Sequence, residues 1–173
     1  MVKQGEIRYK REGLRHSDRA HTETMKPNTL PLWAQRAAVL AIQLLFLMVW
    51  GFAGIDKIRT GMPAWFPGKF GGTILGTFPG VSASFWLLAG SELVGFCLAA
   101  AAVLTGEWLR CRRRRLTVAT VTWSLFVFLQ LNLGNQLTGD FNATAGMFTY
   151  FAGTLLALTF LASLPEGEDR KAV

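Results

Sequence analysis

Histidine and paired cysteine are almost missing from this sequence, and their scarcity excludes several kinds of redox centre. The two histidines, His16 and His21, lie near the N-terminus, so none falls within a long apolar run. We therefore expect no b-type haem held by two histidines between helices. Cys97 and Cys111 share neither a short spacing nor a plausible common depth, which argues against a disulfide or a C-x-x-C centre. No catalytic Ser-His constellation is visible. No set of metal ligands is visible either, so we expect no bound metal.

The sequence also lacks a recognisable nucleic-acid module, although it is strongly basic. It has 18 Lys and Arg against 11 Asp and Glu, a formal net charge of +7. Seven basic residues lie in residues 1–31, and five form a cluster: Arg110, Arg112, Arg113, Arg114 and Arg115. Because both groups flank apolar runs, they indicate membrane topology and binding to anionic lipids, not nucleic acid. The alternative for the arginine cluster is docking of an acidic cytosolic partner.

Apolar residues are abundant: they make up 51% of the chain and come in long blocks. Four blocks are long enough to cross a bilayer as helices, at about residues 33–55, 84–104, 116–133 and 143–164. The turns between the spans are short enough to predict an all-α membrane protein built as an up-down four-helix bundle.

The distribution of Lys and Arg predicts the orientation of this bundle. If both termini and the loop at 105–115 share one side, that side carries 15 of these residues. The other side carries three, Lys57, Arg59 and Lys69. The positive-inside rule then places both termini in the cytoplasm, with the bundle in a bacterial or archaeal inner membrane. The membrane domain would span residues 32–165, between a basic N-terminal tail (1–31) and a short C-terminal tail (166–173).

Small residues recur at every fourth position in two of the spans. They are Ser91, Gly95 and Ala99 in the second span and Thr149, Gly153 and Ala157 in the fourth. Such stripes allow helix backbones to approach closely in a membrane.

Residues 60–83 connect the first two spans and combine Gly and Pro with large apolar side chains. Their apolar pieces are too short to cross a membrane. We expect this connection to lie on or dip into the membrane interface, with Trp65 and Phe66 as anchors. A connection of this length is also typical of functional segments, such as a lid over a bundle.

A single charge, Glu92, interrupts the second span, where an ionisable group costs about 2.5 kcal/mol or more unless it finds a partner. Lys57, at the end of the first span, is the expected partner because its long side chain can reach inward. The third and fourth spans bring amide and carboxylate groups to the same half of the bundle. The candidate ligand-binding residues are Lys57, Glu92, Asn132, Asn135, Gln136, Asp140, Trp65, Phe66 and Trp86.

Two interpretations of this polar group remain open. It can be an ion pair and amide network that fixes the register of the helices. It can also be the polar end of a pocket for a small amphipathic ligand, such as a quinone head group, walled by Trp65, Phe66 and Trp86. The pocket hypothesis predicts that Glu92→Gln impairs ligand-dependent activity more than folding.

Several of these residues also belong to a recognisable pattern. The first span ends in Gly54-Ile55-Asp56-Lys57, and it is followed by Pro63-x-Trp65-Phe66 and by Glu92-Leu93-Val94-Gly95. This pattern resembles the DoxX-like membrane proteins over roughly residues 36–164. The resemblance implies a four-helix membrane bundle in which Lys57 and Glu92 match the family's polar points. The long basic N-terminal extension departs from the family pattern and argues against an independent enzyme.

The family includes the DoxD subunits of thiosulfate:quinone oxidoreductase, so the resemblance also implies a function. We expect an integral membrane subunit or accessory of a redox or respiratory complex that interacts with quinone, membrane lipids and other protein subunits. The alternative is a structural or assembly subunit without chemistry of its own. A small-molecule transporter is a third hypothesis, although four helices without an inverted repeat are few for alternating access.

Overall fold

The computed structural model describes residues 30–109 and 114–164, and every regular element within them is a helix. The helices are α2 (Leu32–Thr60), α3 (Trp65–Phe70), α4 (Ile74–Thr77), α5 (Val81–Leu104), α6 (Arg115–Leu137) and α7 (Phe141–Ser163). Helices α2, α5, α6 and α7 are long and apolar enough to cross a membrane. The predicted all-α, four-helix fold is therefore confirmed, and the chain is a multi-pass membrane protein.

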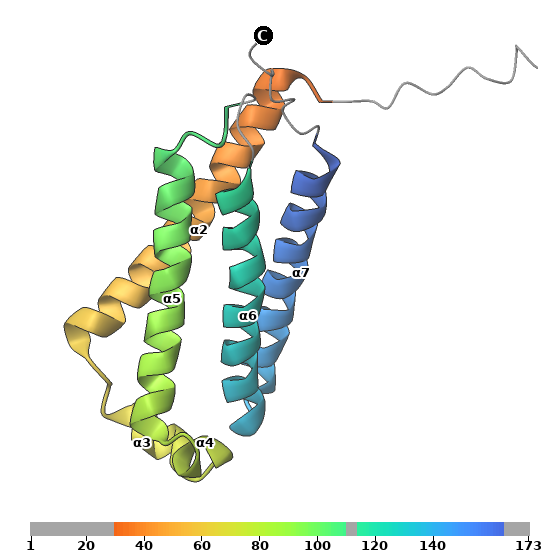
Figure 1. Cartoon of the computed structure of the whole chain (residues 1–173). Helices are drawn as coiled ribbons and strands as arrows, with labels where there is room; N and C mark the ends of the chain where they lie inside the picture. Colours follow the sequence, from red (N-terminus) through yellow and green to blue (C-terminus); the bar gives the residue numbers. More distant parts are fainter. Residues whose placement is uncertain (1–29, 110–113, 165–173) are drawn as a thin grey trace, which may run out of the picture. The chain divides into compact units, whose positions relative to one another are not determined.

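The four long helices run alternately up and down within the unit that begins at Leu32 (Figure 1). They pack in chain order: α2 lies against α5, α5 against α6, and α6 against α7. One end of this bundle carries α3, α4 and the turn between α6 and α7 (Figure 1). The tails at 1–29 and 165–173, together with Arg110, Arg112 and Arg113, lie outside the described residues.

The helices extend beyond the apolar runs that predict them. Helix α2 continues through Asp56 and Lys57 to Thr60, where the Thr60 hydroxyl donates a hydrogen bond to the carbonyl of Asp56. Charged residues at a membrane surface are compatible with helix, so the helix stops only at the following Gly-Met-Pro sequence. Helix α5 starts at Val81, directly after Gly80, whose φ of +102° favours glycine.

Helices α2 and α5 end at different levels, and this difference makes room for other residues. Helix α2 ends three residues after Lys57, whereas α5 begins eleven residues before Glu92, the partner of Lys57. At about 1.5 Å per residue, α5 therefore reaches about 12 Å further along the bundle than α2. The α3–α4 segment (residues 61–80) covers the bundle in the region that α2 leaves open.

The α3–α4 segment is packed against the bundle by aromatic side chains. Phe66, Phe70 and Phe85 are all buried, and the ring centroids of Phe66 lie 4.5 Å from Phe70 and 5.2 Å from Phe85. Trp65 is 61% exposed and has the position expected of an interfacial anchor. Phe66 is not such an anchor, because its ring is buried against Phe70 and Phe85 at the end of the bundle.

The small-residue stripe of α5 lies in the contact with α2. Ser91, Gly95 and Ala99 are all buried, and the backbone at Gly95 approaches the Trp50 ring so closely that a Cβ there would lie 2.9 Å from Trp50 Cδ1. The Trp50 indole N–H donates a 2.8 Å hydrogen bond to Ser124 of α6. On α7, by contrast, Gly153 is exposed and a Cβ there would meet nothing within 4 Å. The predicted close packing is therefore confirmed for α5 and not for Gly153.

The end of the bundle opposite α3 and α4 is held by a buried carboxylate. Glu107 accepts hydrogen bonds from the backbone N–H groups of Leu116 and Thr117, at 2.9 and 2.7 Å, and one from the Thr117 hydroxyl. These N–H groups belong to the first turn of α6, where the helix itself offers them no acceptor. The amide of Gln43 on α2 also donates to Thr117, so one carboxylate network connects α2, α6 and the end of α5.

Replacing Gly95 by Val tests the contact between α2 and α5. The added side chain collides with the Trp50 ring, and overpacking of this kind costs about 1–3 kcal/mol. We expect a lower unfolding temperature in detergent micelles. Gly90→Ala on the same helix is the matched control, because a Cβ there meets nothing within 4 Å, and it should leave the unfolding temperature nearly unchanged. Equal stability of Gly95→Val and wild type would contradict the packing described.

Candidate functional site

An ion pair between α2 and α5 lies at the centre of the site. The Lys57 ammonium donates hydrogen bonds of 2.8 Å to both carboxylate oxygens of Glu92. The Glu92 side chain is 1% exposed, whereas that of Lys57 is 24% exposed. The predicted pairing is therefore confirmed, with the carboxylate as its buried member and the amine as the member that reaches the surface of a cavity.

This pair offsets the free-energy cost of a charge inside a membrane. The carboxylate lies eleven residues into α5, about 16 Å from the start of that helix, which is near the middle of a bilayer about 30 Å thick. A lone carboxylate there would lose its hydration without compensation. With both oxygens bonded to one ammonium, the two charges neutralise each other in place.

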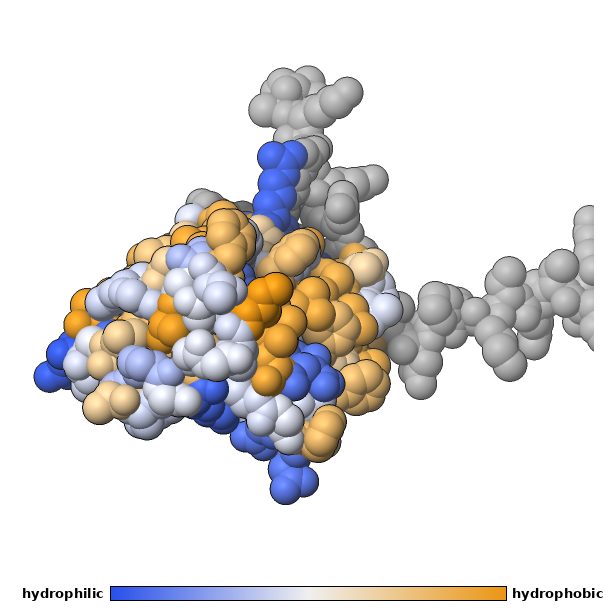
Figure 2. Space-filling view, turned by 90° about the horizontal axis from the view of Figure 1, so that it is seen from below, coloured by the Kyte–Doolittle hydropathy of each residue, from blue (hydrophilic) through white to orange (hydrophobic). Residues whose placement is uncertain are grey.

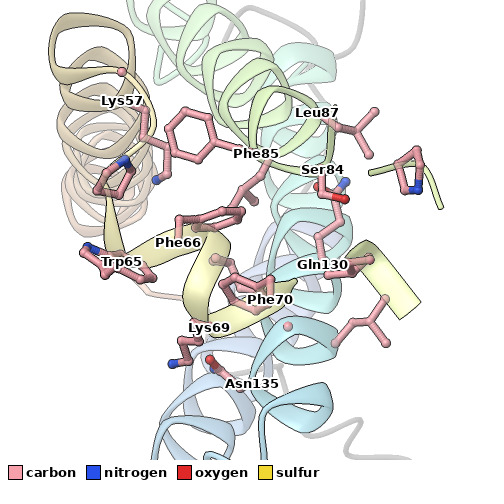
Figure 3. Close-up of a pocket in the computed structure, with 18 of the residues that line it drawn as sticks. Lys57, Trp65, Phe66, Lys69, Phe70, Ser84, Phe85, Leu87, Gln130 and Asn135 are labelled. Carbon is pink, nitrogen blue, oxygen red and sulfur yellow. The ribbon is translucent and has the colours of Figure 1, made fainter. Parts of the chain in front are cut away.

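A cavity of about 530 Å³ lies beside the ion pair, under the α3–α4 segment (Figure 3). Its volume is within the range of about 300–1,000 Å³ that is usual for small-molecule sites. Most of its wall is apolar and includes Trp65, Phe66, Phe70, Phe85, Leu87, Leu88, Leu131 and Leu133. Its polar side chains are few: Asp56, Lys57, Thr60, Lys69, Ser84, Gln130 and Asn135.

The two lysines of the cavity are both neutralised by carboxylates outside its lining. Lys57 is paired with Glu92, and Lys69 of α3 lies 3.3 Å from a carboxylate oxygen of Asp140. The remaining charged residue of the lining, Asp56, is exposed at the cavity's edge. Figure 2 looks onto this end of the bundle and shows hydrophilic residues (blue) and strongly apolar residues (orange) on the same face. Of the charges at the cavity, only that of Asp56 at the edge has no ion-pair partner among the described residues.

Asp140 holds the α3–α4 segment and the start of α7 at the same time. One of its oxygens accepts the backbone N–H of Ala143, which caps α7, while the other pairs with Lys69. The Ala143 N–H, and after it the Lys69 ammonium, lower the pKa of the Asp140 carboxyl below its usual value. The Lys69–Asp140 pair is exposed, so it contributes little to the free energy of unfolding. We interpret it as a contact that positions the α3–α4 segment against the start of α7.

Two polar groups of the cavity wall come from neighbouring helices. The Gln130 amide of α6 accepts a 3.0 Å hydrogen bond from the Ser91 hydroxyl of α5. Ser84 lies about two helical turns before Ser91 on the same side of α5. Its hydroxyl oxygen is buried and has no hydrogen-bond partner within the described residues. Figure 3 draws Ser84 and Gln130 on the opposite side of the view from Lys57 and Trp65. Lys69 and Asn135 lie at a third place in the same view, so polar groups of the wall are separated by apolar side chains.

The structure places some of the predicted site residues at the cavity and others away from it. Lys57, Trp65, Phe66 and Asn135 line the cavity, and Glu92 and Asp140 act behind it through the two lysines. Three predicted residues are not in the lining: Asn132, Gln136 and Trp86. Gln136 is exposed, and Trp86 is half exposed with its ring edge-on to Phe85, so Phe85 occupies the wall position predicted for Trp86.

Sequence reasoning missed Ser84, Gln130, Lys69, Phe70 and Phe85 as cavity residues. One signal was available for Ser84: with Leu88 and Ser91 it recurs at the spacing of one helix face. No comparable signal existed for Lys69 or Phe70, because their position depends on how the α3–α4 segment folds back. Of the arginine cluster, Arg114 and Arg115 are described, at the start of α6.

No protein-family model, curated protein or solved structure matches this chain. The fold and the site define the chain as a four-helix, multi-pass membrane protein with a largely apolar cavity beside a buried ion pair. The resemblance to the DoxX-like family stays a prediction that rests on the sequence motifs.

Removing one member of the ion pair should be more harmful than removing both. Glu92→Leu leaves the Lys57 ammonium without its carboxylate, and breaking a buried pair in this way costs about 3 kcal/mol or more. The double variant Lys57→Met, Glu92→Leu replaces both charges by apolar groups of similar size, and we expect it to recover most of the lost stability. Denaturant unfolding in micelles measures both. A double variant no more stable than Glu92→Leu would contradict this account.

The lowered pKa of Asp140 predicts a dependence of stability on pH. Because the folded-state pKa lies below the unfolded-state value, the ionised carboxylate stabilises the fold above about pH 4, the usual value for Asp. This contribution is lost as the pH falls through the folded-state pKa. Asp140→Asn should therefore remove part of the acid sensitivity of the unfolding temperature between about pH 5 and pH 2. An unchanged acid profile in Asp140→Asn would show that the pairs with Ala143 and Lys69 do not form.

Proposed function

We propose that this chain is a subunit or accessory of a membrane redox complex and binds a quinone-class ligand in the cavity under the α3–α4 segment. The observation that carries the proposal is the cavity itself. It is apolar over most of its wall, large enough for a substituted ring, and bordered by a lysine whose charge is fixed by a buried carboxylate. A neutral ring with a hydrogen-bonding oxygen at each side can direct one oxygen to Lys57 and the other to Ser84 and Gln130.

Charge favours a neutral ligand over an ionic one. Lys57 and Lys69 are neutralised by Glu92 and Asp140, so they offer little attraction to an anion. Asp56 at the cavity's edge disfavours an anion further. The Lys57 ammonium can still donate a hydrogen bond to a carbonyl or hydroxyl oxygen, because it has three protons.

The rim of the cavity favours entry from the membrane. Leu87 of α5 and Leu133 of α6 both line the cavity, and they are 65% and 52% exposed. On a helix that crosses a bilayer, exposed leucines face lipid chains. The cavity therefore borders the hydrocarbon between α5 and α6, and a ligand with an apolar tail can place its ring inside while its tail stays in the lipid.

The sequence supports the cellular setting of this proposal. The DoxX-like resemblance, which includes subunits of a quinone-reducing complex, points to a redox assembly in an inner membrane. The excess of Lys and Arg on one side supports an orientation with both termini in the cytoplasm and the cavity in the outer half of the bilayer. The arginine cluster and the basic N-terminal tail would then face anionic lipids and partner subunits.

A structural or assembly subunit is the second candidate, and the ion pair favours it too. Lys57 and Glu92 are fully paired without any ligand, so they can fix the register of α2 against α5 on their own. The two candidates differ in whether the cavity binds a ligand, and this difference can be measured directly.

Saturation binding of a radiolabelled, short-tailed para-benzoquinone to the protein in lipid nanodiscs tests the proposal. Empty nanodiscs give the partition of the ligand into lipid. We expect saturable binding by the wild type and a loss of at least about tenfold in affinity in the folded double variant Lys57→Met, Glu92→Leu, which lacks the ammonium donor. Gly153→Ala on the lipid-facing side of α7 is the control and should bind like wild type. Binding no greater than in empty nanodiscs would contradict the proposal and favour a structural subunit.

A further inference from the structure

Ser91 has one hydroxyl proton and two acceptors within reach. Its oxygen lies 2.8 Å from the carbonyl of Leu88, in the preceding turn of α5, and 3.0 Å from Oε1 of Gln130 on α6. A serine hydroxyl donates one proton and can accept hydrogen bonds at the same time. It can therefore donate to Leu88 and accept from Gln130, or donate to Gln130.

Each arrangement of Ser91 fixes a different orientation of the Gln130 amide. If Ser91 donates to Gln130, the amide oxygen is turned toward Ser91 and the amide NH₂ group is left to donate elsewhere. If Ser91 donates to Leu88, the amide can rotate so that its NH₂ group donates to Ser91, which leaves the oxygen to accept elsewhere. Since Gln130 lines the cavity, the cavity wall can offer either a donor or an acceptor at the same point.

The backbone of Ser91 is held by a hydrogen bond that does not involve its hydroxyl. The indole N–H of Trp123 on α6 donates a 2.8 Å hydrogen bond to the backbone carbonyl of Ser91. Ser91 itself is 7% exposed, so water is nearly excluded as a competing partner. Ser84 adds a second adaptable hydroxyl in the cavity wall, because its buried oxygen has no partner among the described residues.

We propose that Gln130, coupled to Ser91 and assisted by Ser84, binds the same ring oxygen of a para-quinone in both its oxidised and its reduced form. The inference rests on the proposed function and deepens it. Reduction by two electrons and two protons converts each carbonyl oxygen, which only accepts, into a hydroxyl, which also donates. A site with fixed donors alone would leave both hydroxyl protons of the reduced form without an acceptor, and Gln130 provides an acceptor for one of them. Gln130 changes from donor to acceptor, while Lys57 donates to the other ring oxygen in both forms.

The test measures the affinity of wild-type protein in nanodiscs for a short-tailed para-benzoquinone and for its hydroquinone, the latter under anaerobic conditions. We expect the two dissociation constants to agree within about tenfold, since both forms accept a hydrogen bond from Lys57 and form one with Gln130, and the reduced form leaves only one hydroxyl proton without an acceptor. Gln130→Met keeps the length of the side chain but removes donor and acceptor together. It should weaken the binding of both forms by about fivefold or more.

An infrared measurement identifies the contact independently of affinity. With ¹³C-labelled carbonyl groups, both carbonyl bands of the bound quinone should shift to lower frequency in wild type, and one should return toward the frequency of the free quinone in Gln130→Met. A preference of more than about tenfold for one redox form, or unchanged affinity and carbonyl bands in Gln130→Met, would overturn the inference. Absence of binding of either form would instead overturn the proposed function on which it rests. Gly153→Ala serves again as the control for folding.

Discussion

The pair of Lys57 and Glu92 is the interaction on which the rest of this structure depends. A carboxylate near the middle of a membrane helix requires a cation close by, and the 2.8 Å contacts of Lys57 with both oxygens supply it. Because Lys57 lies only three residues before the end of α2, its contact with Glu92 sets the level along α5 at which α2 ends. The α3–α4 segment lies beyond this end of α2. The cavity forms where that segment covers the bundle without filling it.

The bundle uses two buried carboxylates in different ways. At the end opposite α3 and α4, Glu107 accepts hydrogen bonds from backbone and side-chain donors of α6. Halfway along α5, Glu92 instead holds a lysine whose amine remains partly exposed at the wall of the cavity under the α3–α4 segment. A carboxylate that only fixes helix register would be expected to resemble Glu107. The partial exposure of Lys57 and the adaptable polar wall at Gln130 favour a ligand site at the α3–α4 end.

The sequence predicts the four helices well because their length and apolarity depend on the chain alone. It also predicts the ion pair, since a buried charge and a long amine at a similar depth leave few alternatives. It does not predict the cavity wall. Adjacent residues on a helix point about 100° apart, so whether Phe85 or Trp86 faces inward depends on how α5 is rotated in the bundle. The contributions of Lys69 and Phe70 depend on the path of residues 61–80, which tertiary packing decides. Whether Gln130 faces the cavity with its amide oxygen or its NH₂ group depends on hydrogen bonds between two helices.

Photoaffinity labelling with an azido-substituted para-benzoquinone, followed by mapping of the labelled peptides, tests the central claim most directly. The protein is labelled in its native membrane or in nanodiscs, with an excess of unlabelled quinone as competitor. The account predicts competed labelling in the peptides that carry the cavity wall, residues 61–80 of the α3–α4 segment and the part of α5 around Phe85 and Leu87. Labelling that is spread over the exposed face of α7, or that the competitor does not reduce, would contradict it.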